Sequence, residues 1–202
     1  MENLCCSCGL TRVRSQFGFY EYPMEPSPEL LWLWQEVGVL VGSEYSADAA
    51  TTASSVNNSL IAAEMVVAAG GPRPDILTYV WLWPDAVPVS AAQLAASVVV
   101  PAGMGADGII IWGSSEDAHV GGYSGTITSF LEAAVGPLIE GCAAHTAQCA
   151  AALCSGHGRC SSFDPAAPEK GCSPPASPAD VKCVCDDGWT GPKCGTKALQ
   201  PR

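Results

Sequence analysis

The chain has 202 residues, the size of one medium domain or of one domain with a small module attached. Nine lysines and arginines stand against 20 aspartates and glutamates, so the net charge is −11 and the pI is about 4.5. A chain this acidic lacks the basic face that nucleic acids require, and it gains no attraction to anionic membranes. Hydrophobic residues make up 48% of the chain, which excludes a disordered protein.

The first 141 residues are predicted to alternate strands and helices. Residues 16–22 are rich in aromatic β-formers, and Ser27 followed by Pro28 is typical of a helix start. In chain order, strands are expected at residues 16–22, 37–45, 75–83 and 108–112. The first helix is expected to begin at Ser27, with Leu30 to Trp34 on its buried side. The others are expected at 55–70, from Ser90 to an interruption at Pro101, and at 124–139.

Four βα units in succession predict an α/β fold with a parallel sheet. Because a closed (β/α) barrel has eight units, we expect a partial barrel of about four, with two open sheet edges and an apolar face. The predicted boundaries are an unassigned segment at 1–15, the partial barrel at 16–141 and a disulfide-rich module at 142–202. A mobile loop rich in Pro, Ala and Ser is expected near 161–182.

The cysteines are distributed unevenly. Cys5, Cys6 and Cys8 lie at the N-terminus, residues 9–141 hold none, and eight of the 11 lie between residues 142 and 194. The C-terminal segment is too short and too poor in apolar residues for a core of its own, so it is expected to depend on disulfides. This predicts an extracellular, lysosomal or vesicular location.

The N-terminus does not carry the apolar run of a signal peptide. A protein that needs export but shows no such signal is expected to begin upstream of Met1. No apolar stretch approaches the roughly 20 residues of a spanning helix without small or breaking residues, so no membrane span is predicted.

The last cysteines follow the pattern C-x-C-x-x-G-aromatic-x4-C, which is formed by Cys183, Cys185, Gly188, Trp189 and Cys194. Together with the upstream C-S-G-H-G-R-C run at 154–160, this pattern resembles EGF-like modules. The pairing in that family implies the disulfides Cys149–Cys160, Cys154–Cys183 and Cys185–Cys194. Sequence alone allows 15 pairings of six cysteines.

A zinc site with cysteines and His157 is the competing interpretation of this segment. It is disfavoured because paired C-x-x-C knuckles are missing, and the acidic lead of calcium-binding EGF-like modules is missing too. The sequence therefore predicts no metal and no cofactor. Cys142 and Cys172 could form a fourth bridge. The three N-terminal cysteines lie too close together for an easy mutual bridge, so one or more is expected to stay free or to pair outside the chain.

Several segments of the first 141 residues resemble the hyaluronidase family of glycoside hydrolases. G-F-Y-E-Y-P at 18–23 is similar to the family's G-F-Y-G-F-P strand, and L-W-L-W-Q-E at 31–36 to its S-W-L-W-N-E helix. I-L-T-Y at 76–79, with Asp85 six residues after the tyrosine, resembles its L-P-Y…D strand. G-I-I-I-W-G-S-S at 108–115 is close to G-V-I-I-W-G-S-S. The junction from Gly136-Pro137 into the cysteine-rich tail also matches.

This resemblance implies a distorted (β/α) barrel that hydrolyses β-1,4 N-acetylhexosaminide bonds in hyaluronan or chondroitin with retention of configuration. The substrate's own N-acetyl carbonyl is the nucleophile, which is an exception to the two-carboxylate rule. A glutamate protonates the leaving oxygen, and an aspartate two residues earlier orients the acetamide. Tyr20, Tyr79 and Trp112 correspond to the aromatic residues that enclose the acetamide.

The catalytic carboxylate pair is missing from this sequence, because no glutamate has an aspartate two positions before it. In the family the pair lies on an earlier strand, upstream of the region that this chain resembles. The 202 residues alone are therefore expected to be inactive on hyaluronan or chondroitin. Glu21, Glu116 and Asp117 are the other candidate carboxylates, and loop or solvated positions are expected for them.

Each candidate residue also has a plain structural interpretation. Tyr20, Tyr79 and Trp112 could be core aromatics, and barrel packing is favoured over a sugar groove for Trp81 and Trp83.

The isolated histidines His119, His145 and His157 are expected to be exposed or hydrogen-bonded. Asn57 begins the glycosylation sequon Asn-Asn-Ser, which matters only if the chain is exported. The alternative function is a non-catalytic secreted protein that binds glycan or protein through the EGF-like module.

Overall fold

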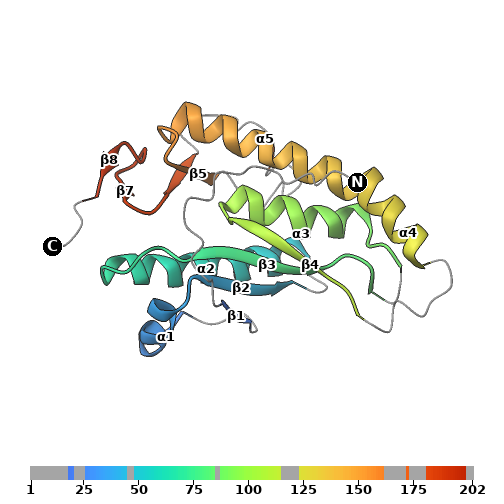
Figure 1. Cartoon of the computed structure of the whole chain (residues 1–202), viewed down its shortest axis with the longest axis horizontal. Coiled ribbons are helices and arrows are strands. Elements are labelled where there is room, and N and C mark those ends of the chain that lie inside the picture. The colour runs from blue at the N-terminus through green and yellow to red at the C-terminus, as the bar shows by residue number, and fades with distance from the viewer. Residues whose placement is uncertain are drawn as a thin grey trace, which may run out of the picture.

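A parallel four-stranded sheet forms the centre of the chain (Figure 1). The structure is a computed structural model that describes residues 18–20, 26–44, 48–84, 87–114, 123–161, 172 and 181–198. The strands are β1 (Gly18–Tyr20), β2 (Val39–Glu44), β3 (Asp75–Trp81) and β4 (Gly108–Trp112), in the order β1-β2-β3-β4. Every neighbouring pair is parallel, which confirms the predicted parallel sheet of successive βα units.

A helix follows each strand. The helices are α1 (Leu31–Glu36, entered through the 3-10 turn Pro28–Leu30), α2 (Ala49–Ala68), α3 (Ala91–Met104) and α4 (Tyr123–Phe130). A π-helical stretch, Leu131–Val135, joins α4 to α5 (Gly136–Leu153). Ser27 accepts a hydrogen bond from the backbone N–H of Glu29 at 3.3 Å, so the predicted start of the first helix is confirmed.

The main core lies between one face of this sheet and α2 and α3. Along β3, Ile76, Thr78 and Val80 are buried on that face. Ile76 belongs to the cluster that includes Val66 of α2, and Val80 to the cluster that includes Val98 of α3. The alternate residues of β3 are half-buried, so the strand has one face packed under helices and one more open face.

The two outer strands of the sheet are β1 and β4. Within the described ranges neither has a second strand beside it. A free edge presents unpaired backbone N–H and C=O groups. The expectation of two open edges therefore holds for the part of the chain that the structure describes.

Several predicted elements are corrected by the structure. Trp32 is 66% exposed, because a helix of six residues buries one side and Trp34, which is fully buried, occupies it. Helix α3 continues through Pro101 to Met104, since the burial of Val98, Val99 and Val100 offsets the cost of a helical proline, about 3 kcal/mol. The last helix runs to Leu153 rather than to Ile139, across the predicted boundary at residue 142.

Helix α2 begins six residues earlier than predicted because Asp48 caps it. The Asp48 carboxylate accepts hydrogen bonds from the backbone N–H groups of Ala50 and Thr51 at 2.9 and 3.0 Å, and from the Thr51 hydroxyl at 3.1 Å. The bonds from Thr51, followed by the one from Ala50, lower the pKa of Asp48 below its usual value. The threonines and serines at 51–55, which are weaker helix formers than the alanines beside them, hid this start from sequence analysis.

Asp48→Asn is expected to make α2 less sensitive to acid. Because the pKa of Asp48 is lower in the folded state, the ionised cap stabilises the fold above the unfolded pKa of about 3.9. That stability is lost as the pH falls through the folded value. Asparagine caps equally well without titrating. The melting temperature of the wild type should therefore fall more than that of the variant when the pH drops below about 4. Equal losses would contradict the assignment.

The C-terminal cysteines form a module joined to α5. Strand β5 (Gly158–Ser161) pairs antiparallel with β6 (Lys182–Cys185), and β7 (Trp189–Thr190) pairs with β8 (Thr196–Lys197). The disulfides are Cys149–Cys160, Cys154–Cys183, Cys185–Cys194 and Cys142–Cys172. The first three are the pairs that the EGF-like resemblance implies. Buried cystines and the flanking Leu153, Val181 and Trp189 make up the interior of this module.

Some predicted features lie outside the described residues. These are Cys5, Cys6, Cys8, Glu21, Asp85, Glu116, Asp117, His119 and most of the predicted loop at 161–182.

The helical stretch Ser124–Leu153 is long and apolar enough to cross a membrane by length and composition, with a mean hydropathy of 1.2 over its best window. A helix that packs on a protein core passes the same test. One side of this helix, including Ile127 and Val135, belongs to the cluster around Val98 of α3. Cys142 and Cys149 on the same helix are bonded to the module. Only 11% of its most apolar window is buried in the fold, so these contacts cover a minority of the helix.

Candidate functional site

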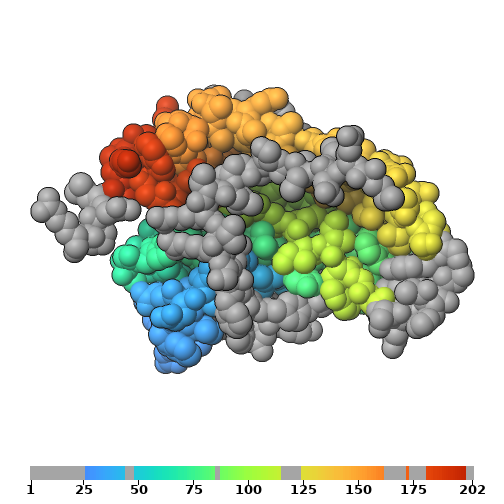
Figure 2. Space-filling model, viewed as in Figure 1, coloured from blue at the N-terminus to red at the C-terminus, as the bar shows by residue number. Residues whose placement is uncertain are grey.

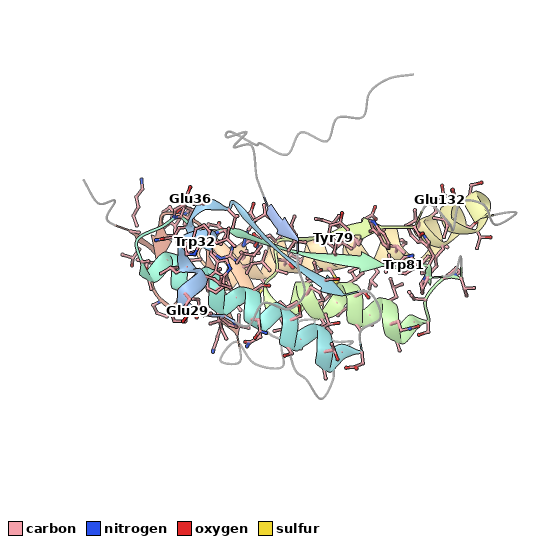
Figure 3. All side chains as sticks on the ribbon, turned by 90° about the horizontal axis from the view of Figure 1, so that it is seen from below. Glu29, Trp32, Glu36, Tyr79, Trp81 and Glu132 are labelled. Atoms are coloured by element: carbon pink, nitrogen blue, oxygen red, sulfur yellow. A yellow bond between two sulfur atoms is a disulfide. The ribbon has the colours of Figure 1, made fainter. Side chains whose placement is uncertain are left out.

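An aromatic group lies at the carboxyl ends of β3 and β4. The strand register places Trp81 directly opposite Trp112, and their rings meet edge to face with centroids 5.1 Å apart at 79°. Tyr79 lies two residues before Trp81 on β3, on the same face of the sheet (Figure 3). Because Trp112 is paired with Trp81 and Ile110 with Tyr79, Trp112 belongs to that face as well. Both are half-buried, and that face is the one opposite the α2–α3 core.

Tyr20 lies on the same sheet, further from these residues. Its backbone is paired with Val41 of β2, which is paired with Leu77 of β3. Tyr20 is therefore two strands from β3, roughly 10 Å at the usual strand spacing. Along the strands, its row of paired residues lies two residues before the row of Tyr79. The structure thus places Tyr79 and Trp112 as near neighbours and Tyr20 at the edge strand.

The other two tryptophans near β3 differ in their surroundings. Trp83 is 7% exposed and belongs to the core cluster with Val80 and Leu82, so the packing interpretation is confirmed for it. Its indole lies against Gly113, where an added Cβ would be 2.8 Å from Trp83 Nε1. Trp81 packs on the same cluster and also contacts Trp112. It therefore supports the ring of Trp112, which the family resemblance predicts to contact the acetamide.

An exposed aromatic residue, Trp32, lies far from this half-buried group. Trp32 on α1 stands between Glu29 and Glu36, one turn away on either side. Figure 3 shows these three residues at the opposite end of the sheet from Trp81. Since the carboxyl ends of parallel strands form the functional edge of α/β folds, Trp32 serves below as a control residue.

Two hollows lie elsewhere on the molecule. A cavity of about 420 Å³ lies between α3, α5 and the start of β4, with Pro101, Asp107 and Ile139 among its lining residues. A groove of about 1270 Å³ separates α2 from the disulfide module (Figure 2). Neither is lined by Tyr79, Trp81 or Trp112. In the ranges that the structure describes, no three His, Cys, Asp or Glu side chains are grouped to hold a metal ion.

The two described histidines have different surroundings. The His157 ring stacks on Trp189 with centroids 3.4 Å apart and planes 6° apart, inside the module. His145 is half-buried on α5, and its Nε2 has no hydrogen-bond partner among the described residues. Both histidines lie outside β3 and β4, which carry the aromatic group. We therefore assign neither histidine to that group.

A charge cluster at the start of β4 joins the sheet to the module. Asp107 Oδ2 accepts hydrogen bonds from Arg73 Nη1 at 3.0 Å and from the backbone N–H of Ile76 at 2.8 Å. Its Oδ1 forms an ion pair with Arg159 on β5, and Arg159 also lies 3.9 Å from Asp186. Sequence analysis missed this cluster, because no local pattern links residues 73, 107 and 159.

Comparisons with known proteins agree on one family. A sequence model of the hyaluronidase family of glycoside hydrolases matches residues 20–170. Hyaluronidase-1 of Homo sapiens is 26% identical over 241 residues, covering 93% of this chain and 55% of that protein. Hyaluronidase-1 of Sus scrofa is 30% identical over 142 residues, covering 65% of this chain and 32% of that protein. Hyaluronidase conohyal-P1 of Conus purpurascens is 27% identical over 206 residues, covering 89% of this chain and 45% of that protein.

The chain spans about half the length of the curated relatives it matches. Among solved structures, bee venom hyaluronidase is similar with a TM-score of 0.48 and 25% identity, over 55% of this chain and 38% of that one. The family model alone covers most of the 202 residues. On that match, the chain belongs to the hyaluronidase family of glycoside hydrolases.

Proposed function

We propose that this chain supplies the acetamide-binding part of a hyaluronidase site. In this proposal Tyr20, Tyr79 and Trp112 enclose the N-acetyl group of an N-acetylhexosamine in hyaluronan or chondroitin. The observation that supports it best is the placement of Tyr79 and Trp112 on one face, at the carboxyl ends of β3 and β4, in a member of this family. Trp81 holds the Trp112 ring by its edge-to-face contact.

The proposed chemistry is substrate-assisted hydrolysis of a β-1,4 N-acetylhexosaminide bond. The carbonyl oxygen of the acetamide attacks the anomeric carbon, and an acid protonates the leaving oxygen. The aromatic walls hold the acetamide in place and keep water from it. No Asp-x-Glu pair exists in the 202 residues, so these residues bind the sugar but do not cleave it by themselves.

The proposal includes the domain organisation and the location of the protein. Residues 16–141 form part of a (β/α) barrel, residues 142–202 form an EGF-like module, and residues 1–15 are left unassigned. The all-parallel sheet supports the first assignment, and the three disulfides Cys149–Cys160, Cys154–Cys183 and Cys185–Cys194 support the second. The disulfides also favour an extracellular, lysosomal or vesicular protein.

Trp112→Ala is expected to weaken binding of a hyaluronan oligosaccharide about tenfold, because it removes a stacking wall worth about 1.4 kcal/mol. Tyr79→Phe removes one hydroxyl and should cost only a few-fold. Titration calorimetry on the purified full chain measures both. Trp32→Ala is the matched control, since it deletes an exposed tryptophan at the other end of the sheet.

Cleavage and binding measurements on the same 202-residue chain and its variants distinguish the proposal from its alternatives. Release of reducing ends from hyaluronan by the 202-residue chain would contradict the claim that it binds without cleaving. Equal affinities of the wild type and Trp112→Ala would contradict the placement of the site. If Trp189→Ala weakens binding instead, the module carries the interaction and the chain is a non-catalytic binding protein.

A further inference from the structure

We propose that Asn57 on α2 carries an N-linked glycan. Asn57-Asn58-Ser59 is the one Asn-x-Ser/Thr sequence in the 202 residues. The proposal goes beyond the hyaluronidase function and does not depend on it.

The structure places this asparagine on the solvent side of its helix. The residues of α2 that pack on the core are Thr52, Ser55, Val56, Ala62, Ala63 and Val66. Asn57 is exposed and continues a stripe of exposed residues at helical spacing that includes Ser54, Ile61 and Glu64. A glycan at this position leaves every buried contact of the helix in place.

The surroundings of Asn57 leave room for a sugar. Asn57 is one of the residues that line the groove of about 1270 Å³ between α2 and the disulfide module. Ile61, one turn further along α2, is 38% exposed, and Val67 is 50% exposed on the same groove. A sugar chain that starts at Asn57 covers apolar surface that the fold itself leaves open to water.

The sequence around Asn57 favours a segment that is not yet helical when the glycan is transferred. Residues 51–59 read T-T-A-S-S-V-N-N-S, in which all but the alanine are mediocre helix formers. This half of α2 therefore forms only once it packs against α3 and the sheet. Before that, the sequon is accessible as extended chain. In the folded state, the Ser59 hydroxyl bonds only to its own helix, at 3.4 Å from the Ser55 carbonyl oxygen.

The disulfides place the chain where the reaction occurs. Four disulfides among the described cysteines require an oxidising compartment, and in eukaryotic cells the secretory pathway provides both oxidation and glycosylation. The co-reactant is an oligosaccharide linked to a polyprenyl pyrophosphate. The bond from Asn57 Nδ2 to the anomeric carbon forms, the bond from that carbon to the pyrophosphate oxygen breaks, and the amide proton leaves with the lipid pyrophosphate.

The test is to express the full chain behind a cleavable secretory leader in cultured eukaryotic cells and treat it with peptide N-glycosidase F. The expected result is a single downward step in apparent mass on gel electrophoresis, with Asn57 converted to aspartate in the released peptide by mass spectrometry. Because transfer precedes folding, chain retained inside the cell is equally informative and is analysed with endoglycosidase H.

Three variants decide the outcome. Asn57→Gln and Ser59→Ala should abolish the step, whereas Asn58→Gln leaves an intact sequon and should keep it. Absence of the step in the wild type, or its persistence in Asn57→Gln, would overturn the proposal. Asn57 and its substitute are both exposed, so loss of the step in this variant does not arise from misfolding.

Discussion

Asp107→Ala is expected to lower the free energy of unfolding by about 3–5 kcal/mol, as is usual when one partner of a buried ion pair is removed. The Asp107 side chain is 9% exposed and serves Arg73, Arg159 and the backbone N–H of Ile76 at once. Without it, two largely buried guanidinium groups lose their shared counter-charge. Arg73 Nη2 and Arg159 Nη1 already have no acceptor among the described residues.

Urea unfolding of the full chain, followed by tryptophan fluorescence, measures this loss. Asp187→Ala is the matched control, because Asp187 is exposed and lies in the module close to Asp186. The control should change stability by less than about 0.5 kcal/mol. A loss below about 1 kcal/mol in Asp107→Ala would show that the cluster is solvated and does not hold the two parts together.

Asp107→Asn separates charge from hydrogen bonding. An asparagine oxygen still accepts from the Ile76 N–H, whose 2.8 Å bond fixes the start of β4 against the start of β3. The variant should therefore lose less stability than Asp107→Ala. A double-mutant cycle with Arg159→Met tests the link between sheet and module. A coupling of more than about 1 kcal/mol is expected for groups in direct contact.

The parallel sheet could be predicted from sequence because its signals are local. Residues 109–112 are a run of apolar β-formers between Gly108 and Gly113, and the structure has a strand at the predicted bounds, Gly108–Trp112. Asp75 to Trp81 is likewise rich in apolar and aromatic β-formers, although the alternation of its burial is not visible in the sequence. Strand type and order follow from such short-range patterns together with the helices between them.

What the sequence could not give depends on contacts between distant residues. Pro101 argues locally for a helix break, and only the buried surroundings of α3 override it. Trp32 and Trp34 are chemically identical, and the short helix buries one of them because of where α2 lies. The Asp107 cluster joins residues 34 and 52 positions apart, which no sequence pattern reports. For the site, the position of Trp112 followed from resemblance, whereas the support it gains from Trp81 became visible only in the fold.

Removing the Cys154–Cys183 disulfide is expected to destabilise the chain more than removing Cys185–Cys194. The first closes a stretch of 29 residues and joins the end of α5 to β6, whereas the second closes nine residues within the module. In the chain-entropy account the losses are about 3.6 and about 2.6 kcal/mol. Paired substitutions, Cys154→Ala with Cys183→Ala and Cys185→Ala with Cys194→Ala, avoid unpaired thiols that could exchange with the remaining bonds.

Each double variant replaces one cystine by two alanines. Each is therefore the control for the effect of losing a cystine as such in the other. Cys154 and Cys194 are both fully buried, which makes the packing cost similar and leaves loop length as the main difference. Urea unfolding under non-reducing conditions should show Cys154→Ala/Cys183→Ala unfolding at the lower midpoint. A reversed order would mean that the Cys185–Cys194 bond holds contacts beyond its own loop. The groove wall formed by Trp189 and Thr196 is where such contacts would lie, because both residues flank that bond.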